Sequence, residues 1–117
     1  MKLYLAIFTG SAAAMDAWKL LDPETRAQRE QAGMNAWQQW ATIHAGAIAD
    51  RGAPLGRTKR VSAEGIADIR NAMGAWTVVR AETHEQAAAM FRDHPHFSIF
   101  AGDGVEVMEC LPMPGQA

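Results

Sequence analysis

The first segment of the chain, residues 2–8, has the sequence KLYLAIF and predicts a β-strand that is apolar on both of its faces. Side chains alternate across a strand, so one face carries Leu3, Leu5 and Ile7. The other face carries Tyr4, Ala6 and Phe8. Residues 74–81, GAWTVVRA, predict a second strand with apolar side chains on both faces. A sheet built from such strands needs cover on two sides, and this requirement limits the folds open to the chain.

A long amphipathic helix is expected between these two strands. Pro23 suits the first turn of a helix, and Asp22 can cap it. The helix is expected to run to about Ala49, before Gly52 and Pro54 end it. Its apolar stripe follows the three- and four-residue spacing of one helix face and consists of Trp37, Trp40, Ala41, His44, Ala47 and Ile48.

Shorter predicted helices and strands complete the order of elements along the chain. Residues 11–22 predict a short helix or an ordered loop, and residues 66–71 alternate too imperfectly for an assignment. Thr83 and Gln86 match a capping box that begins a second helix, which must end by His94 because the residue before proline disfavours the helical region. Two further strands are expected, at residues 55–61 and 105–111.

The order of strand, long helix, strand, strand, short helix and strand predicts a single α+β domain over residues 1–117. It is the order of a ferredoxin-like split βαβ fold, an antiparallel sheet with both helices on one face. Two helices cover only that face, so the opposite face would expose a large apolar patch. We therefore expect a homodimer in which two sheets bury about 800 Å² per partner.

Composition excludes several classes of function. Eleven basic and thirteen acidic residues give a net charge of −2, which provides no field to attract nucleic acid or an anionic membrane. No apolar stretch approaches the length of a membrane-spanning helix, and no signal-type segment is recognisable, so a cytoplasmic location is expected. The single cysteine, Cys110, cannot form an internal disulfide or a thiolate metal cluster.

The carboxyl-terminal half carries a family resemblance. The run GAWTVVRAETHEQAAAMFRDHPHF, continued by HPHFSIFAGDGVEVMECLPMPG, resembles the YCII-related domain family, whose members adopt the dimeric α+β barrel fold. The similarity extends over nearly the whole chain and is most specific in the last thirty or so residues. Many members carry a histidine early in the long helix and an aspartate before a proline, often proposed as a polar pair. Here Ala36 or Trp37 stands at the first place and His94 at the second.

The segment Asp93, His94 and His96 is the main candidate for chemistry. A histidine exchanges protons near neutral pH, and an adjacent carboxylate can fix its tautomer. Two histidines around a proline could also supply two metal ligands, although no metal motif such as HExxH is present and no metal site is predicted. The structural alternative is that one histidine caps the helix end while the other packs or faces water.

A second candidate group lies on the stripe of the long helix. His44 shares that face with Trp37 and Trp40, and a polar group there needs a partner or a cavity. One interpretation is an ordinary core with a hydrogen-bonded histidine. The other is a ligand pocket between helix and sheet, with the tryptophans as walls and His44 as the orienting group.

Two functions follow from these candidates. The first is a cofactor-independent enzyme of the lyase or isomerase type that moves a proton on a small aromatic or cyclic organic molecule. The wider superfamily of the family resemblance includes isomerases, lyases and monooxygenases, which favours this hypothesis by analogy. The second is a non-catalytic dimeric module that binds a small molecule or another protein. Haem or metal binding through His94 or His96 is a third hypothesis.

Overall fold

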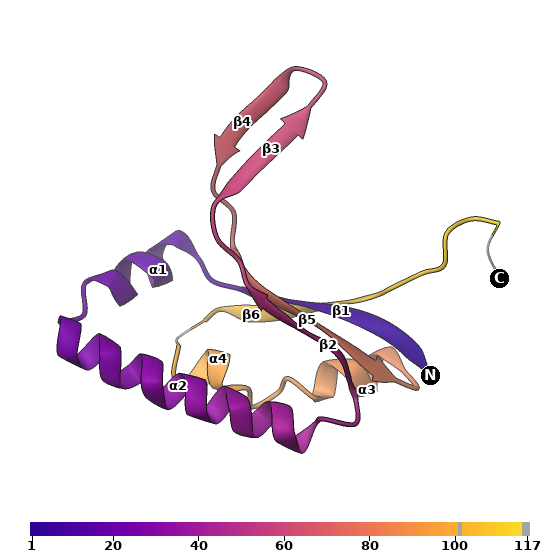
Figure 1. Cartoon of the computed structure of the whole chain (residues 1–117), viewed down its shortest axis with the longest axis horizontal. Coiled ribbons are helices and arrows are strands. Elements are labelled where there is room, and N and C mark those ends of the chain that lie inside the picture. The colour runs from indigo at the N-terminus through magenta and orange to yellow at the C-terminus, as the bar shows by residue number, and fades with distance from the viewer. Residues whose placement is uncertain (101, 116–117) are drawn as a thin grey trace.

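The computed structural model describes residues 1–100 and 102–115, and its centre is a four-stranded antiparallel sheet (Figure 1). The strands lie in the order β2-β5-β1-β6. They are β1 (Lys2–Thr9), β2 (Ile48–Pro54), β5 (Met73–Ala81) and β6 (Gly104–Glu109). The two central strands are the two that the sequence predicts as apolar on both faces. This topology confirms the predicted ferredoxin-like α+β class.

Helices α2, α3 and α4 lie on one side of the sheet (Figure 1). The helices are α1 (Ala12–Lys19), α2 (Pro23–Ile43), α3 (His84–Ala89) and α4 (Pro95–Ser98). The predicted caps are confirmed, since Asp22 accepts a hydrogen bond from the Thr25 N–H at 2.6 Å and Thr83 accepts one from the Gln86 N–H at 3.2 Å. Within the described residues, no helix is both long and apolar enough to cross a bilayer.

The long helix ends earlier than the sequence predicts. It stops at Ile43 instead of about Ala49, and His44 is its C-cap. Ile48 then begins β2 and pairs with Val79 of the central strand β5. Pairing with a distant strand therefore overrides the helical spacing of the segment, as tertiary contacts commonly override local pattern.

Other boundaries also differ from the sequence predictions. Of the predicted strand 55–61, only residues 58–61 lie in a strand, β3 (Thr58–Ser62), which forms a separate hairpin with β4 (Gly65–Ile69). The segment after His94 does not simply leave the helix, because Pro95 starts the short α4. The last strand ends at Glu109, two residues before its predicted end, because its pairing with β1 ends at Tyr4 opposite Glu109.

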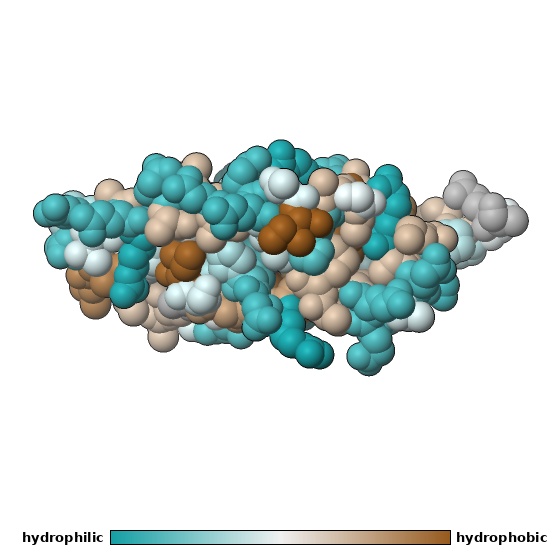
Figure 2. Space-filling model, turned by 90° about the horizontal axis from the view of Figure 1, so that it is seen from below, coloured by the Kyte–Doolittle hydropathy of each residue, from teal (hydrophilic) through white to brown (hydrophobic). Residues whose placement is uncertain are grey.

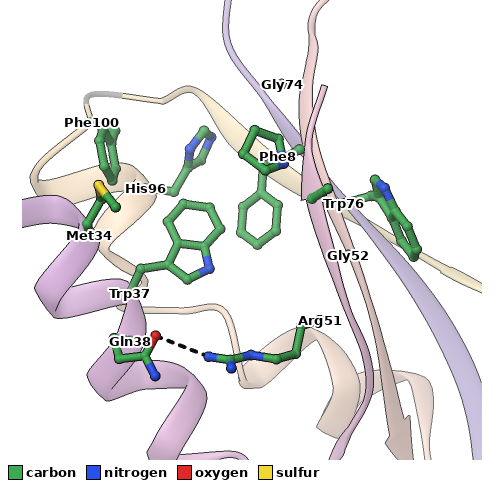
Figure 3. A pocket seen from close by; sticks show the side chains of 13 residues that line it. Phe8, Met34, Trp37, Gln38, Arg51, Gly52, Gly74, Trp76, His96 and Phe100 are labelled. Carbon is green, nitrogen blue, oxygen red and sulfur yellow. Dashed lines mark hydrogen bonds between the residues drawn. The ribbon is translucent and has the colours of Figure 1, made fainter. Parts of the chain in front are cut away.

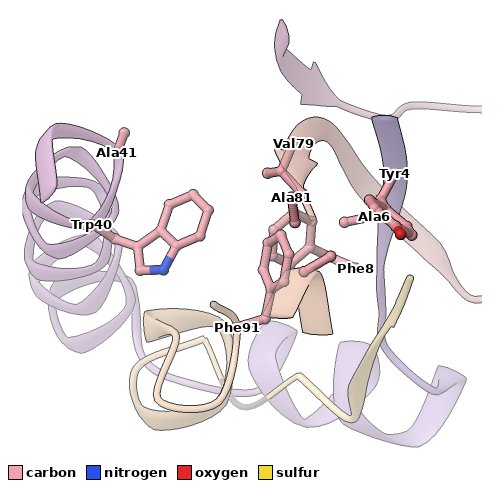
Figure 4. Close-up of a cluster of buried hydrophobic side chains, with 9 residues drawn as sticks. Tyr4, Ala6, Phe8, Trp40, Ala41, Val79, Ala81 and Phe91 are labelled. Carbon is pink, nitrogen blue, oxygen red and sulfur yellow. The ribbon is translucent and has the colours of Figure 1, made fainter. Parts of the chain in front are cut away.

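The core lies between the sheet and the helices (Figure 4). From β1, the alternate side chains Tyr4, Ala6 and Phe8 are buried, in agreement with the predicted faces. They pack with side chains of β5, α2, α3 and the turn after α3, namely Val79, Ala81, Trp40, Ala41, Ala87 and Phe91. Burial of these apolar groups is the main favourable contribution to folding.

The opposite face of the sheet carries apolar side chains without a covering helix. Leu5 and Ile7 of β1 pair with Val78 and Trp76 of β5, and all four are only half-buried. The β3–β4 hairpin projects from the body on this side of the sheet (Figure 1). The helix side carries hydrophilic side chains interspersed with apolar ones (Figure 2). These side chains of β1 and β5 are therefore apolar surface that the helices of this chain leave uncovered.

Candidate functional site

A cavity of about 490 Å³ lies between α2 and the edge of the sheet formed by β2 and β5 (Figure 3). Its volume is within the range of about 300–1,000 Å³ typical of small-molecule sites. Most of its wall is apolar or aromatic. The side chains that define it include Phe8, Met34, Trp37, His96 and Phe100.

Aromatic rings from three separate segments form the wall. Phe8 of β1 and Trp37 of α2 have ring centroids 4.7 Å apart, and Trp37 lies 6.0 Å from Phe100, which follows α4. Gly33 is one turn before Trp37 and lies against the Phe100 ring. A side chain at position 33 would overlap that ring, so the glycine allows Phe100 to close the cavity against α2.

The edge strand β2 supplies the opposite side of the cavity. Gly52 has a φ of +67°, and a Cβ there would overlap the backbone carbonyl of Trp76. The pairing between β2 and β5 is irregular between Asp50 and Ala53, as expected for a bulge. Glycine is needed at this position both for its backbone conformation and for the close approach of the two strands.

His96 is the histidine in the cavity wall. Its side chain is buried, and its Nε2 lies 2.8 Å from the backbone carbonyl oxygen of Thr9. A carbonyl only accepts hydrogen bonds, so Nε2 carries the proton and the neutral ring keeps its lone pair on Nδ1. Gly102 packs against the same ring so closely that a side chain there would overlap it. His96 is therefore held in one orientation and one tautomer.

His96 and Phe100 also border a second hollow of about 370 Å³. Met15, Trp18 and Lys19 of α1 line its other side. The two hollows therefore share one histidine and one aromatic ring, and Lys19 places a positive charge at the edge of the second hollow only.

His94 is fully buried behind the cavity wall. Its Nδ1 accepts a hydrogen bond from the His96 backbone N–H at 3.0 Å, so the neutral ring carries its proton on Nε2. Among the described residues Nε2 has no hydrogen-bond partner, and the ring lies edge-on to Trp37 with centroids 4.3 Å apart. Burial, followed by the charges of His96 and His44, lowers the pKa of His94 to about 3. His94 is accordingly neutral at physiological pH.

The remaining predicted site residues lie away from the cavity. Trp40 is buried in the core, where its Nε1 donates a hydrogen bond to the Met90 carbonyl at 2.9 Å. His44 is half-buried at the end of α2, with its ring centroid 4.9 Å from that of Trp40. Asp93 is exposed. Of the six predicted residues, the structure therefore brings only Trp37 and His96 together in the cavity wall.

Several cavity residues had no role in the sequence-based hypotheses. The sequence placed Phe8 only on the strand face that it shares with Tyr4 and Ala6. Phe100 and Arg51 carried no recognisable pattern, because their proximity to Trp37 depends on the tertiary fold. Among the described residues, no group of three or more histidine, cysteine, aspartate or glutamate side chains could hold a metal ion.

Comparison with known proteins identifies the fold. No protein-family model matches the chain, and no curated protein sequence matches it. A solved structure is similar over 98% of this chain and 99% of its own, with a TM-score of 0.55 and 12% sequence identity. It is the 5-chloro-2-hydroxyhydroquinone dehydrochlorinase from Burkholderia phenoliruptrix AC1100 in complex with 2,5-dihydroxybenzoquinone. At this level of identity the likeness concerns the fold alone, and the chain has the α+β fold of the dimeric α+β barrel proteins.

Proposed function

We propose that this protein is a cofactor-independent enzyme of the lyase or isomerase type that transfers a proton on a small aromatic or cyclic organic molecule. The observation that carries the proposal is a cavity with aromatic walls in which His96 is held by the Thr9 carbonyl. A base that is orientated by a second group is the usual arrangement for general acid–base catalysis. The ligand would lie against Trp37 and Phe8, with its exchangeable proton toward His96.

In this proposal the two histidines have different roles. His96 is the catalytic residue, since it borders the cavity and has a free lone pair on Nδ1 in the neutral ring. His94 is a positioning residue, because its Nδ1 accepts the His96 backbone N–H and its ring supports Trp37. Catalytic roles for His94 and Asp93, and ligand contacts for Trp40 and His44, stay predictions.

The fold relationship supports the choice of substrate class. The structural neighbour is named for its action on a chlorinated hydroxyhydroquinone and was solved with a dihydroxybenzoquinone. Together with the sequence resemblance, this supports assignment of the chain to the YCII-related family. A planar, oxygenated ring is therefore the first class of compound to test.

The experiment is a screen of hydroxylated aromatic and cyclic compounds for solvent deuterium uptake or turnover, read by NMR. We expect His96→Asn to lower the rate at least about a hundredfold while ligand binding persists, as for loss of a general base. His84→Asn is the matched control, since His84 is exposed and its Nε2 contacts the Val107 carbonyl of the distant strand β6. A rate that is equal in wild type and His96→Asn would overturn the proposal.

A non-catalytic module is the second candidate function. The exposed apolar side chains of the β3–β4 hairpin, Val61 at 75% and Ile66 at 71%, favour association with another molecule. We propose a second copy of this chain as that partner. The location of the protein in the cytoplasm also stays a prediction. Ligand binding in the cavity without any turnover or exchange would support the module over the enzyme.

A further inference from the structure

The cavity has a charged group on one side of its mouth. Of the residues described as lining it, Arg51 is the only lysine, arginine, aspartate or glutamate. Its Nη2 donates a hydrogen bond to Oε1 of Gln38, another lining residue, at 3.2 Å. The guanidinium is thus held against α2 by a neutral amide, which leaves its positive charge without a neutralising carboxylate in the cavity wall.

The neighbouring carboxylate is engaged elsewhere. Oδ1 of Asp50 accepts a hydrogen bond from the Gly52 N–H at 2.9 Å, within the bulge of β2. The ion pairs in the described part of the chain join Lys2 to Glu109 and Lys59 to Asp68. Arg51 is therefore available to an anion that enters the cavity.

Arg51 and His96 lie on opposite sides of the Trp37 indole (Figure 3). Gln38 is the residue after Trp37 on α2, so the same turn of helix presents the aromatic wall and the partner of the arginine. A ring that stacks along Trp37 would thus have one edge toward the guanidinium and the other toward the imidazole.

We propose that the ligand is an aromatic carboxylate whose carboxylate group is bound by Arg51, so that its far edge is presented to His96. This inference rests on the proposed function and adds the substrate class. A guanidinium offers parallel N–H donors that match the two oxygens of a carboxylate. Arg51 is the specificity-determining residue, and Gln38 positions it.

The second hollow offers a competing site for the same anion. Lys19 lines that hollow, on the other side of His96 and Phe100. An ammonium is a point charge without the fork geometry of arginine, and the hollow lacks the Trp37 face. We therefore place the carboxylate at Arg51, and the experiment includes Lys19 as a separate arm.

The test compares 2,5-dihydroxybenzoate with its neutral isostere 2,5-dihydroxybenzamide, by calorimetry or ligand-detected NMR at fixed ionic strength. Wild type should bind the benzoate more tightly. Because Arg51 is exposed, we expect Arg51→Gln to weaken benzoate binding about tenfold and to change benzamide binding by less than about twofold. Arg51→Lys should fall between wild type and Arg51→Gln.

Control variants separate the outcomes. Arg29→Gln removes an exposed arginine from α2 outside the cavity and should leave both affinities unchanged. Equal affinity for the two probes, or a loss of benzoate binding in Lys19→Gln but not in Arg51→Gln, would overturn the inference. Trp37→Leu should weaken the binding of both probes. If Trp37→Leu weakens the binding of neither probe, the ligand site itself is misplaced and the proposed function fails with it.

Discussion

The backbone N–H of His96 donates a hydrogen bond to Nδ1 of His94 at 3.0 Å, and this contact joins two imidazoles with opposite surroundings. The His94 ring lies in the core among aromatic side chains, including Trp37 and Trp40. The His96 ring lies in the cavity wall and contacts the Thr9 carbonyl at the end of β1. The segment 94–96 therefore connects the core to the site.

The first prediction concerns the acid sensitivity of the fold. The pKa of His94 is about 3 in the folded chain against an ordinary value of 6.5, so below pH 6.5 the unfolded chain binds a proton that the folded chain does not. The stability that depends on neutral His94 is complete above pH 6.5 and is lost as the pH falls toward 3. At pH 5 the loss is about 2 kcal/mol.

Urea unfolding at pH 7 and pH 5 measures this loss. His94→Asn keeps an acceptor for the α4 cap but removes the buried imidazole ring, so its free energy of unfolding at pH 7 should be lower than that of wild type. Because asparagine does not titrate, this free energy should change less between pH 7 and pH 5 than it does in wild type. The exposed His84→Asn is the control and should retain the wild-type pH dependence. An undiminished pH dependence in His94→Asn would show that other groups cause the acid sensitivity.

The second prediction uses the contact between Gly102 and His96. A Cβ at position 102 would overlap the His96 imidazole, so Gly102→Ala must displace the ring or the backbone. We expect a loss of about 1–3 kcal/mol in the free energy of unfolding, together with reduced His96-dependent turnover. Gly56→Ala is the control, because nothing lies within 4 Å of its Cβ position. Equal stability and turnover in the two variants would contradict the tight contact.

Local sequence signals predicted the starts of the main helices and the two faces of β1. Asp22, Pro23 and Thr83 act within a few residues of themselves, so their caps follow from the sequence alone. The end of α2 does not follow from the local sequence, because Ile48 joins β2 through pairing with Val79, about thirty residues away. Long-range pairing is invisible to helical periodicity.

The candidate site was only partly predictable for the same reason. Trp37 and Trp40 are three positions apart on one helix face, yet Trp37 lines the cavity and Trp40 is buried against Phe91. Which of two neighbouring stripe residues faces a cavity depends on how α2 sits on the sheet. Arg51 lies in a segment that was expected to lie just beyond the long helix, so its approach to Gln38 had no sequence signal.

The third prediction concerns Gly33 on α2. In a helix, alanine is ordinarily more stable than glycine by about 1 kcal/mol. Here a Cβ would overlap the Phe100 ring, so Gly33→Ala should be destabilising and should change ligand affinity, because Phe100 closes the cavity. Phe100→Leu in the same chain should recover part of the lost stability. Thermal unfolding of the single and double variants measures the destabilisation and its recovery. A Gly33→Ala variant more stable than wild type would refute the contact.

The fourth prediction concerns the sheet face opposite the helices. We expect the wild-type chain, of 12.7 kDa, to have twice that mass in light scattering. Leu5→Lys places a charge on the apolar face and Ile66→Lys places one on the hairpin, so each should weaken the dimer at least about thirtyfold. Burying an unpaired lysine in an apolar interface is the physical reason.

Ile43→Lys is the matched control for this prediction, because Ile43 is 77% exposed at the end of α2 on the helix side. It should leave the mass unchanged. Circular dichroism shows whether each variant is folded, which separates loss of the dimer from loss of the fold. If wild type is monomeric at micromolar concentration, or if both Leu5→Lys and Ile66→Lys remain dimeric, a second copy does not cover this face and the apolar side chains of β1 and β5 must meet another partner.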